Sequence, residues 1–182
     1  NYINLSALFD YINKENIPIV WTFHDCWPFT GQCPYFDIVG CQKWKTHCEK
    51  CMMYREYPET KKDRSFQMYD FKRQLFTSVS DMTIVTPSNW LGGLVTESFL
   101  NCFKVRVINN GVDQSIFRPT ESAFRKDYEL ENKFIILGVA SAWGKRKGLD
   151  RFVALSKSLD SRFKIVLVGI EQAELNVPDI LC

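Results

Sequence analysis

The sequence predicts an α/β fold built from two Rossmann-like, doubly wound domains. Strand-sized apolar segments alternate with amphipathic segments of helical period along the 182 residues. Residues 134–140 are apolar throughout, which is typical of a strand whose two faces are covered in a parallel sheet. Turn-forming residues interrupt the pattern between positions 109 and 119. We therefore expect residues 1–112 to be the last part of one domain and residues 113–182 to be the start of another.

The first half of the chain should contain three strands and three helices. Apolar residues at positions 5, 8, 9 and 12 have the helical period, whereas residues 17–23 are mainly β-branched and aromatic. Ser88 should be the N-cap of the third helix, and Ser65 or Asp63 that of the second. We expect strands at residues 17–23, 82–86 and 105–108, and helices at residues 5–13, 66–76 and 89–99.

The second half should begin with a turn and continue as a βαβ unit. The strand at 105–108 runs into Asn109, Asn110 and Gly111, which indicates a turn because Asn and Gly tolerate positive φ. Little chain follows the last expected strand, and a lone βαβ unit leaves strand edges exposed, so we expect an excerpt cut inside both domains. Beyond the turn we expect helices at residues 121–130 and 149–158 and strands at residues 134–140 and 163–168.

The composition is that of a globular protein. Hydrophobic residues make up 46% of the chain and aromatic residues 14%, enough for a packed core. The net charge of +2 gives no indication of nucleic acid binding. No apolar run approaches the ~20 residues of a membrane span, and the chain does not open with a basic region followed by an apolar one. We expect a cytoplasmic location, or a peripheral one at the cytoplasmic membrane.

Three cations precede the helix expected at residue 149. Lys145, Arg146 and Lys147 stand before Gly148, in a turn that follows the strand at 134–140. Such a run is usually a solvated helix start. However, cations at a helix N-terminus oppose the helix dipole by about 0.3–1 kcal/mol each, and a bound anion offsets that cost. The residues alone leave a phosphate site and a solvated turn equally open.

His24 and Asp25 follow the strand at 17–23. Ligands of open α/β sheets bind at the carboxyl ends of strands, which favours a functional role for His24. The alternative is a packed, hydrogen-bonded histidine. No paired carboxylates lie nearby in the sequence, so a double-displacement mechanism has little support.

Residues 26–62, the Cys-rich loop, are too long for an ordinary connection. Cys48 and Cys51 have the spacing of half a zinc knuckle, whereas the other spacings are not those of a standard ribbon. Three interpretations stay open: a structural zinc site, free thiols, and disulfides. His47 is a further candidate ligand. The zinc site would use Cys33, Cys41, Cys48 and Cys51.

Basic and aromatic residues alternate between positions 41 and 64. The segment contains seven Lys or Arg and four Asp or Glu, which gives a net charge of +3, and Trp44, Tyr54 and Tyr57 lie among them. This segment could contact anionic lipid headgroups or a lipid diphosphate acceptor, at about 1 kcal/mol per well-placed cation. It could equally be a soluble loop surface.

These motifs together resemble the retaining glycosyltransferases of family 4, which have the GT-B fold. The resemblance rests on Val-Ile-Asn-Asn-Gly-Val-Asp at 107–113, Phe-Arg-Pro at 117–119 and Lys147-Gly148. Where the family often has an Arg before its Lys-Gly, this chain has Ser-Ala-Trp-Gly at 141–144. The His-Asp-Cys-Trp motif at 24–27 and the cysteine pattern of the following loop resemble a bacterial subgroup that builds capsule, lipopolysaccharide or other exopolysaccharide.

The resemblance implies a sugar transfer from a nucleotide-sugar donor to a glycan or lipid-linked acceptor, with anomeric configuration retained. Lys147 and Arg146 are then expected to bind the donor phosphates, Gly111 to border the cleft and His24 to face the sugar. The chain has no Asp-x-Asp motif, which fits catalysis without a metal cofactor. The family's Gly-rich loop should precede residue 1 and its Glu-x7-Glu segment should follow residue 182, so we expect this polypeptide alone to be inactive.

Two other classes compete with this interpretation. One is a zinc-dependent nucleic-acid-binding module on residues 26–64, which the cysteines and the +3 charge favour. The near-neutral chain and its α/β pattern remain unexplained under that alternative, and we expect no nucleic acid partner. The other is a nucleotide-binding enzyme with different chemistry, because a fold alone does not fix a function.

Overall fold

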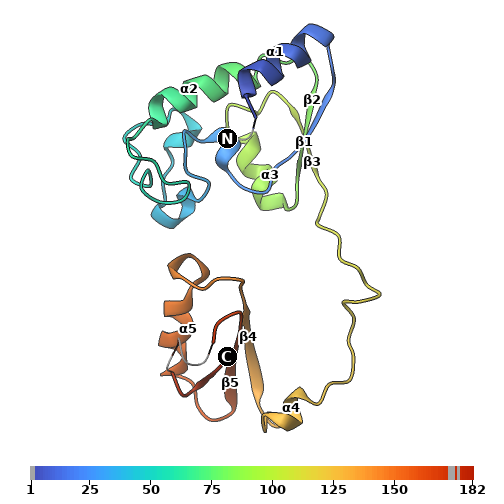
Figure 1. The fold of residues 1–182 in the computed structure, drawn as a ribbon, viewed down its shortest axis with the longest axis vertical. Coiled ribbons are helices and arrows are strands. Elements are labelled where there is room, and N and C mark those ends of the chain that lie inside the picture. Colours follow the sequence, from blue (N-terminus) through green and yellow to red (C-terminus); the bar gives the residue numbers. More distant parts are fainter. Residues whose placement is uncertain (1–2, 172–174, 176) are drawn as a thin grey trace. The chain divides into compact units, whose positions relative to one another are not determined.

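The structure is a computed structural model that describes residues 3–171, 175 and 177–182. The chain divides into two compact units, Asn1–Val112 (unit 1) and Asp113–Cys182 (unit 2). Each unit contains a three-stranded sheet in which all neighbouring strands are parallel (Figure 1). The α/β class is therefore confirmed, whereas the assignment of unit 1 to the acceptor side and unit 2 to the donor side stays a prediction.

Unit 1 has the sheet order β1-β2-β3, with β2 in the centre. The central strand is the most buried of the three, as expected for a strand with a neighbour on each side. The strands are β1 (Ile19–Thr22), β2 (Met82–Thr86) and β3 (Lys104–Val107), and the helices are α1 (Leu5–Glu15), α2 (Ser65–Phe76) and α3 (Asn89–Thr96). All six elements were predicted, with small shifts at their ends.

The helices of unit 1 begin where side chains satisfy their first N–H groups. The Ser88 hydroxyl accepts from the N–H of Leu91 (3.3 Å), so the predicted N-cap of α3 is confirmed. At α2, Asp63 accepts from the N–H of Ser65 (2.9 Å). The N-cap of α2 is Arg64 and Ser65 is the first helical residue, so neither predicted candidate is the N-cap, although Asp63 satisfies the first N–H group of the helix.

The Cys-rich loop contains short 3-10 helices, η1 (Trp27–Phe29), η2 (Phe36–Val39) and η3 (Lys43–Lys45), and otherwise irregular chain. It nevertheless belongs to the core of unit 1. Phe29, Phe36 and Trp44 are buried and pack together, with ring centroids 4.8–6.5 Å apart. Their cluster is continuous with the apolar residues of the helices and the sheet. The Cys-rich loop is therefore an integral, packed part of unit 1.

Unit 2 has the sheet order β4-β5-β6. Its elements are α4 (Phe124–Asp127), β4 (Phe134–Val139), η4 (Lys145–Lys147), α5 (Leu149–Ser156), β5 (Phe163–Val168) and β6 (Ile180–Leu181). The helix predicted at 121–130 is much shorter than expected. The Ser122 hydroxyl accepts from the N–H of Phe124 (3.2 Å) and delays its start, and Glu129 adopts a left-handed conformation (φ 54°) just beyond its end. The two-residue β6 was not predicted.

The expectation that β4 is covered on both faces is wrong for the described residues. One face packs toward α5, where Gly138 lies against Trp143 and Phe152. On the other face, Leu137 and Val139 are 60% and 66% exposed. Among the residues that the structure describes, β4 pairs only with β5 and α5 covers one side of it, so its apolar sequence does not correspond to burial on both faces.

Candidate functional site at the carboxyl ends of the strands

In unit 1, the carboxyl ends of the three strands are held together by hydrogen bonds. The N–H of Phe23 donates to the carbonyl of Val85 (2.8 Å), and that of Ile108 to Thr86 (2.9 Å). The Asn109 amide donates to the carbonyl of Pro87 (2.8 Å). This edge of the sheet is where open α/β folds bind their ligands.

His24 is exposed at this edge, directly after β1. The next residue forms a tight turn, because the Asp25 carboxylate accepts from the N–H of Trp27 (2.8 Å). The turn separates β1 from η1 and leaves the His24 imidazole at the surface. The alternative of a packed, hydrogen-bonded histidine is therefore not what the structure shows.

The buried side chain of Lys72 contacts this turn, and this role was not predicted from the sequence. Its ammonium donates to the carbonyls of Trp27 (2.6 Å) and Thr30 (2.9 Å) and lies 3.7 Å from the centre of the Trp27 ring. The side chain is fully buried, and burial lowers the pKa of Lys72 to about 7. The burial of Lys72 could have been predicted, because this residue lies three positions after Tyr69 on the apolar stripe of α2.

In unit 2, a cavity of about 640 Å³ lies at the carboxyl ends of β4 and β5. The Trp143 indole donates to the carbonyl of Val168 (3.0 Å) and ties the turn after β4 to the end of β5. Gly169 has a φ of 90°, and a Cβ there would lie 1.7 Å from the carbonyl oxygen of Ala140. The close approach of the two strand ends therefore requires glycine. Residues lining the cavity are Ser141, Ala142, Trp143, Gly169, Ile170 and Glu171.

The predicted phosphate-binding residues stand on the continuation of this turn. Arg146 and Lys147 belong to η4 and are exposed. Gly148, with a φ of 74°, is the N-cap of α5. The side chain of Lys145 is outside the described part of the chain. A cationic turn at a helix N-terminus is confirmed, and phosphate binding by it stays a prediction.

The turn predicted at Asn109–Gly111 is wrong. These residues continue from β3 without a turn and without a positive φ. A Cβ on Gly111 would meet nothing within 4 Å. The hydrogen bond from the Asn109 amide to the Pro87 carbonyl holds the chain in continuation of β3. Gly111 and His24 belong to unit 1 and Arg146 and Lys147 to unit 2, so a cleft shared by all four stays a prediction.

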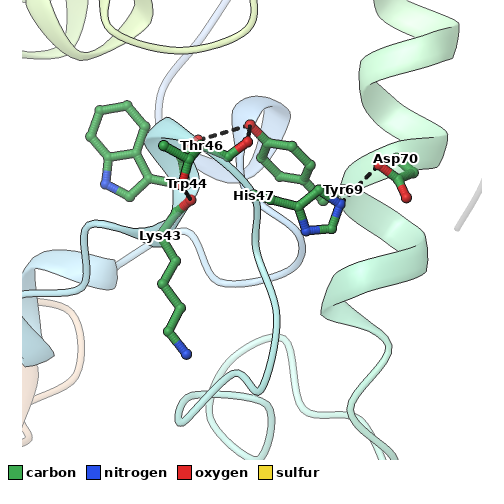
Figure 2. A network of polar contacts seen from close by, with 6 residues as sticks. All are labelled: Lys43, Trp44, Thr46, His47, Tyr69 and Asp70. Carbon is green, nitrogen blue, oxygen red and sulfur yellow. Dashed lines mark hydrogen bonds and ion pairs between the residues drawn. The ribbon is translucent and has the colours of Figure 1, made fainter.

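The Cys-rich loop is fastened to α2 by polar contacts (Figure 2). The Tyr69 hydroxyl lies between the carbonyls of Trp44 (3.0 Å) and Thr46 (3.1 Å). His47 Nε2 lies 2.9 Å from the Asp70 carboxylate, and its ring packs on Tyr69. His47 therefore has a structural partner on α2, which argues against its predicted role as a metal ligand.

Four of the seven cysteines line one small cavity of about 30 Å³, namely Cys33, Cys41, Cys48 and Cys51. All seven are free thiols. Cys33 and Cys51 share a hydrogen bond, which lowers the pKa of Cys51 to about 7 and raises the pKa of Cys33. Burial raises the pKa of Cys48 to about 11. Within the described ranges, no three His, Cys, Asp or Glu side chains are already arranged as metal ligands.

The basic residues at 41–64 are exposed, whereas the aromatic residues among them differ in their burial. Trp44 is buried at 1% exposure. Lys45 forms an ion pair with Glu97 (2.5 Å), and Lys43 donates to the carbonyl of Glu49 (3.0 Å). The seven Lys and Arg side chains of the segment and Tyr57 are exposed, so contact with a membrane or a lipid-linked acceptor stays a prediction. Among the described residues, no helix has the length and apolarity needed to cross a bilayer.

The chain is similar to a putative colanic acid biosynthesis glycosyl transferase, WcaC, of Escherichia coli (strain K12). The two are 37% identical over 108 residues, which cover 57% of this chain and 25% of that protein. The similarity therefore spans about a quarter of the relative's length. No protein-family model matches the chain, and no solved structure matches it.

Proposed function

We propose that this chain is part of a glycosyltransferase that uses a nucleotide-sugar donor in the biosynthesis of a cell-surface polysaccharide. The observation that carries the proposal is the 37% identity to the putative colanic acid biosynthesis glycosyl transferase. The two parallel sheets, each with polar or cationic residues at the carboxyl ends of its strands, are consistent with it. We further propose that the whole enzyme has the GT-B fold and belongs to family 4.

In this proposal, unit 2 binds the donor. The cavity at the ends of β4 and β5 is large enough for part of a nucleotide. Lys147 and Arg146 lie beside it in the chain, at the N-terminus of α5, where cations and backbone N–H groups together favour phosphate. Their charges would stabilise the diphosphate as it leaves, a role that a divalent metal has in other transferases.

Unit 1 would contribute His24 and face the acceptor. The exposed imidazole would donate a hydrogen bond to the transferred sugar and stabilise charge in the transition state. The bond between the sugar carbon and the diphosphate oxygen breaks while the acceptor oxygen bonds to the same face of that carbon. The proton of the acceptor hydroxyl passes to the leaving phosphate, so configuration is retained without a protein nucleophile. The acceptor would be a glycan or a lipid-linked glycan.

The test is donor hydrolysis by the complete reading frame that contains this chain. Purified enzyme is incubated with a panel of UDP-, GDP- and ADP-sugars, and the release of nucleoside diphosphate is followed by mass spectrometry. Slow release from one donor supports the proposal. Lys147→Ala should abolish this release, whereas Lys157→Ala, an exposed lysine just beyond the other end of α5, should leave it unchanged.

Absence of hydrolysis with every donor is resolved by calorimetry on the same folded enzyme. Binding of one donor without turnover indicates that the acceptor is needed for transfer. Absence of both binding and hydrolysis contradicts the proposal. A salt-dependent gel shift with mixed-sequence DNA or RNA would instead favour the nucleic-acid-binding alternative.

A further inference from the structure

The four cysteines that line the small cavity in unit 1 form a candidate metal site that is separate from the proposed transfer chemistry. We propose that Cys33, Cys41, Cys48 and Cys51 bind one structural Zn²⁺ ion and thereby hold the Cys-rich loop in its fold. The inference does not depend on the proposed function. It rests on the cavity, on the backbone geometry around the cysteines and on the contacts of their sulfur atoms.

The backbone brings the cysteines together from three separate segments of the loop. Cys33 follows η1, Cys41 follows η2, and Cys48 and Cys51 follow η3. Gly40 ends η2 in a left-handed conformation (φ 61°), so that the chain reverses just before Cys41. Lys50 also has a positive φ (47°), which is uncommon for a residue other than glycine. It bends the chain between Cys48 and Cys51, so that both thiols reach the same cavity.

Two of the four sulfur atoms have backbone N–H groups as partners. The backbone N–H of Gly31 donates to Cys48, and that of Met53 donates to Cys51. N–H groups directed at sulfur stabilise its anionic form and orient it, as partners of metal ligands do. Gly31 is needed for this approach, because a Cβ there would lie 2.9 Å from the Cβ of Cys48 and 2.4 Å from the carbonyl oxygen of Ser65.

The size and charge of the site fit a single soft cation. A cavity of about 30 Å³ can hold one ion but no organic ligand. Four thiols satisfy the tetrahedral preference of zinc. Binding turns the side chains toward the cavity, exchanges four S–H protons for four Zn–S bonds and leaves a net charge of −2. Lys43 lies close enough to act on Cys51 and partly offsets that charge.

The role of the ion would be structural. Cys33 and Cys48 are buried, and all four ligand positions are filled by protein, which leaves no open position for a substrate. The Cys-rich loop has only short 3-10 helices to order it, and its aromatic side chains belong to the core. Cross-linking three segments through one ion would fix those side chains in place.

The metal content of the purified protein tests the proposal directly. The protein is produced with zinc in the medium, purified under reducing conditions and analysed by inductively coupled plasma mass spectrometry. We expect about one zinc per chain, because four thiolates complete one tetrahedral site. Cys33→Ser and Cys48→Ser should lose the metal. Cys26→Ser, at a buried thiol outside the cavity lining, and Cys102→Ser, at an exposed thiol, should keep it.

A second measurement covers the case in which the ligand variants do not fold. Cobalt replaces zinc in the unaltered protein, and the absorption spectrum is recorded. Intense d–d bands with sulfur-to-cobalt charge transfer indicate tetrahedral thiolate coordination and support the proposal. Folded protein that contains no zinc and takes up no cobalt overturns it. A Cys33–Cys51 disulfide in the non-reducing peptide map of metal-free, folded protein also overturns it.

Discussion

The two units of this chain have sheets of the same size and strand direction, but they differ in what covers them. In unit 1, the Cys-rich loop supplies six of the sixteen buried residues of the core cluster, among them Phe29 and Trp44. In unit 2, the described core cluster has three buried residues, Ile165, Leu167 and Ile180, and one face of β4 is exposed. The comparison teaches that an irregular segment can provide as much of a core as helices do, provided that aromatic side chains and anchoring contacts order it.

The largest expected effect is the loss of a loop side chain from the core of unit 1. Trp44→Ala should lower the free energy of unfolding by about 3–5 kcal/mol, because the buried ring packs against Phe29 and Phe36. Trp90→Ala removes a tryptophan that is 59% exposed on α3 and should change it by no more than about 0.5 kcal/mol. Urea denaturation measures both. Equal effects would mean that the loop is not part of the core.

The next effect is a pH dependence that comes from Lys72. The pKa of Lys72 is about 7 in the folded protein because burial disfavours the charged form, compared with an ordinary 10.5. Between these values the unfolded chain binds the proton and the folded protein does not, so stability rises with pH across this window. The gain is a few kcal/mol and is absent below pH 7.

Lys72→Met isolates this contribution. The free energy of unfolding of the variant should lack the part of the rise that lies between pH 7 and pH 10, since methionine does not titrate. Parallel urea titrations of the two proteins at several pH values give the difference. A difference that is independent of pH would show that Lys72 is charged in the folded state throughout.

A smaller effect is expected at the strand ends of unit 2. Gly169→Ala places a methyl group against the carbonyl of Ala140 at a positive φ, and should cost at least about 1–3 kcal/mol in unit 2. Hydrogen exchange of the individual strands, measured as the temperature is raised, shows which unit loses stability. Unchanged exchange in β4 and β5 would contradict the packing described for this turn.

The smallest effect is a gain in unit 1. Gly93 lies inside α3, and a Cβ there would meet nothing within 4 Å. Gly93→Ala should therefore raise the free energy of unfolding by about 0.5–1 kcal/mol through helix propensity. A loss of stability on urea denaturation would mean that this face of α3 is covered in solution.

Periodicity and turn chemistry predicted most elements of both units, because those signals are local. The capping of α3 by Ser88 and the glycine at the start of α5 are visible in the sequence for the same reason. What could not be predicted depends on distant contacts. The exposure of β4 depends on which faces helices cover, and the straight path at Gly111 depends on the bond between Asn109 and Pro87.

The same distinction between local signals and distant contacts applies to the residues of the candidate sites. The positions of His24, Arg146 and Lys147 at strand and helix ends follow from their sequence neighbours. The separation of Cys26 from the four cavity-lining cysteines does not follow from the sequence, because the spacing of cysteines does not determine how the loop folds. The burial of Lys72 under the Trp27 turn likewise requires the packing of α2, although its place on an apolar stripe was visible.

The central claim is that unit 2 binds the nucleotide-sugar donor whereas the Cys-rich loop of unit 1 is structural. Hydrogen–deuterium exchange of the complete enzyme, with and without the donor that it hydrolyses, tests this most directly. We predict protection of residues 141–148 and 169–171 and unchanged exchange in residues 26–62. Protection confined to the Cys-rich loop, with residues 141–148 unchanged, would contradict the account.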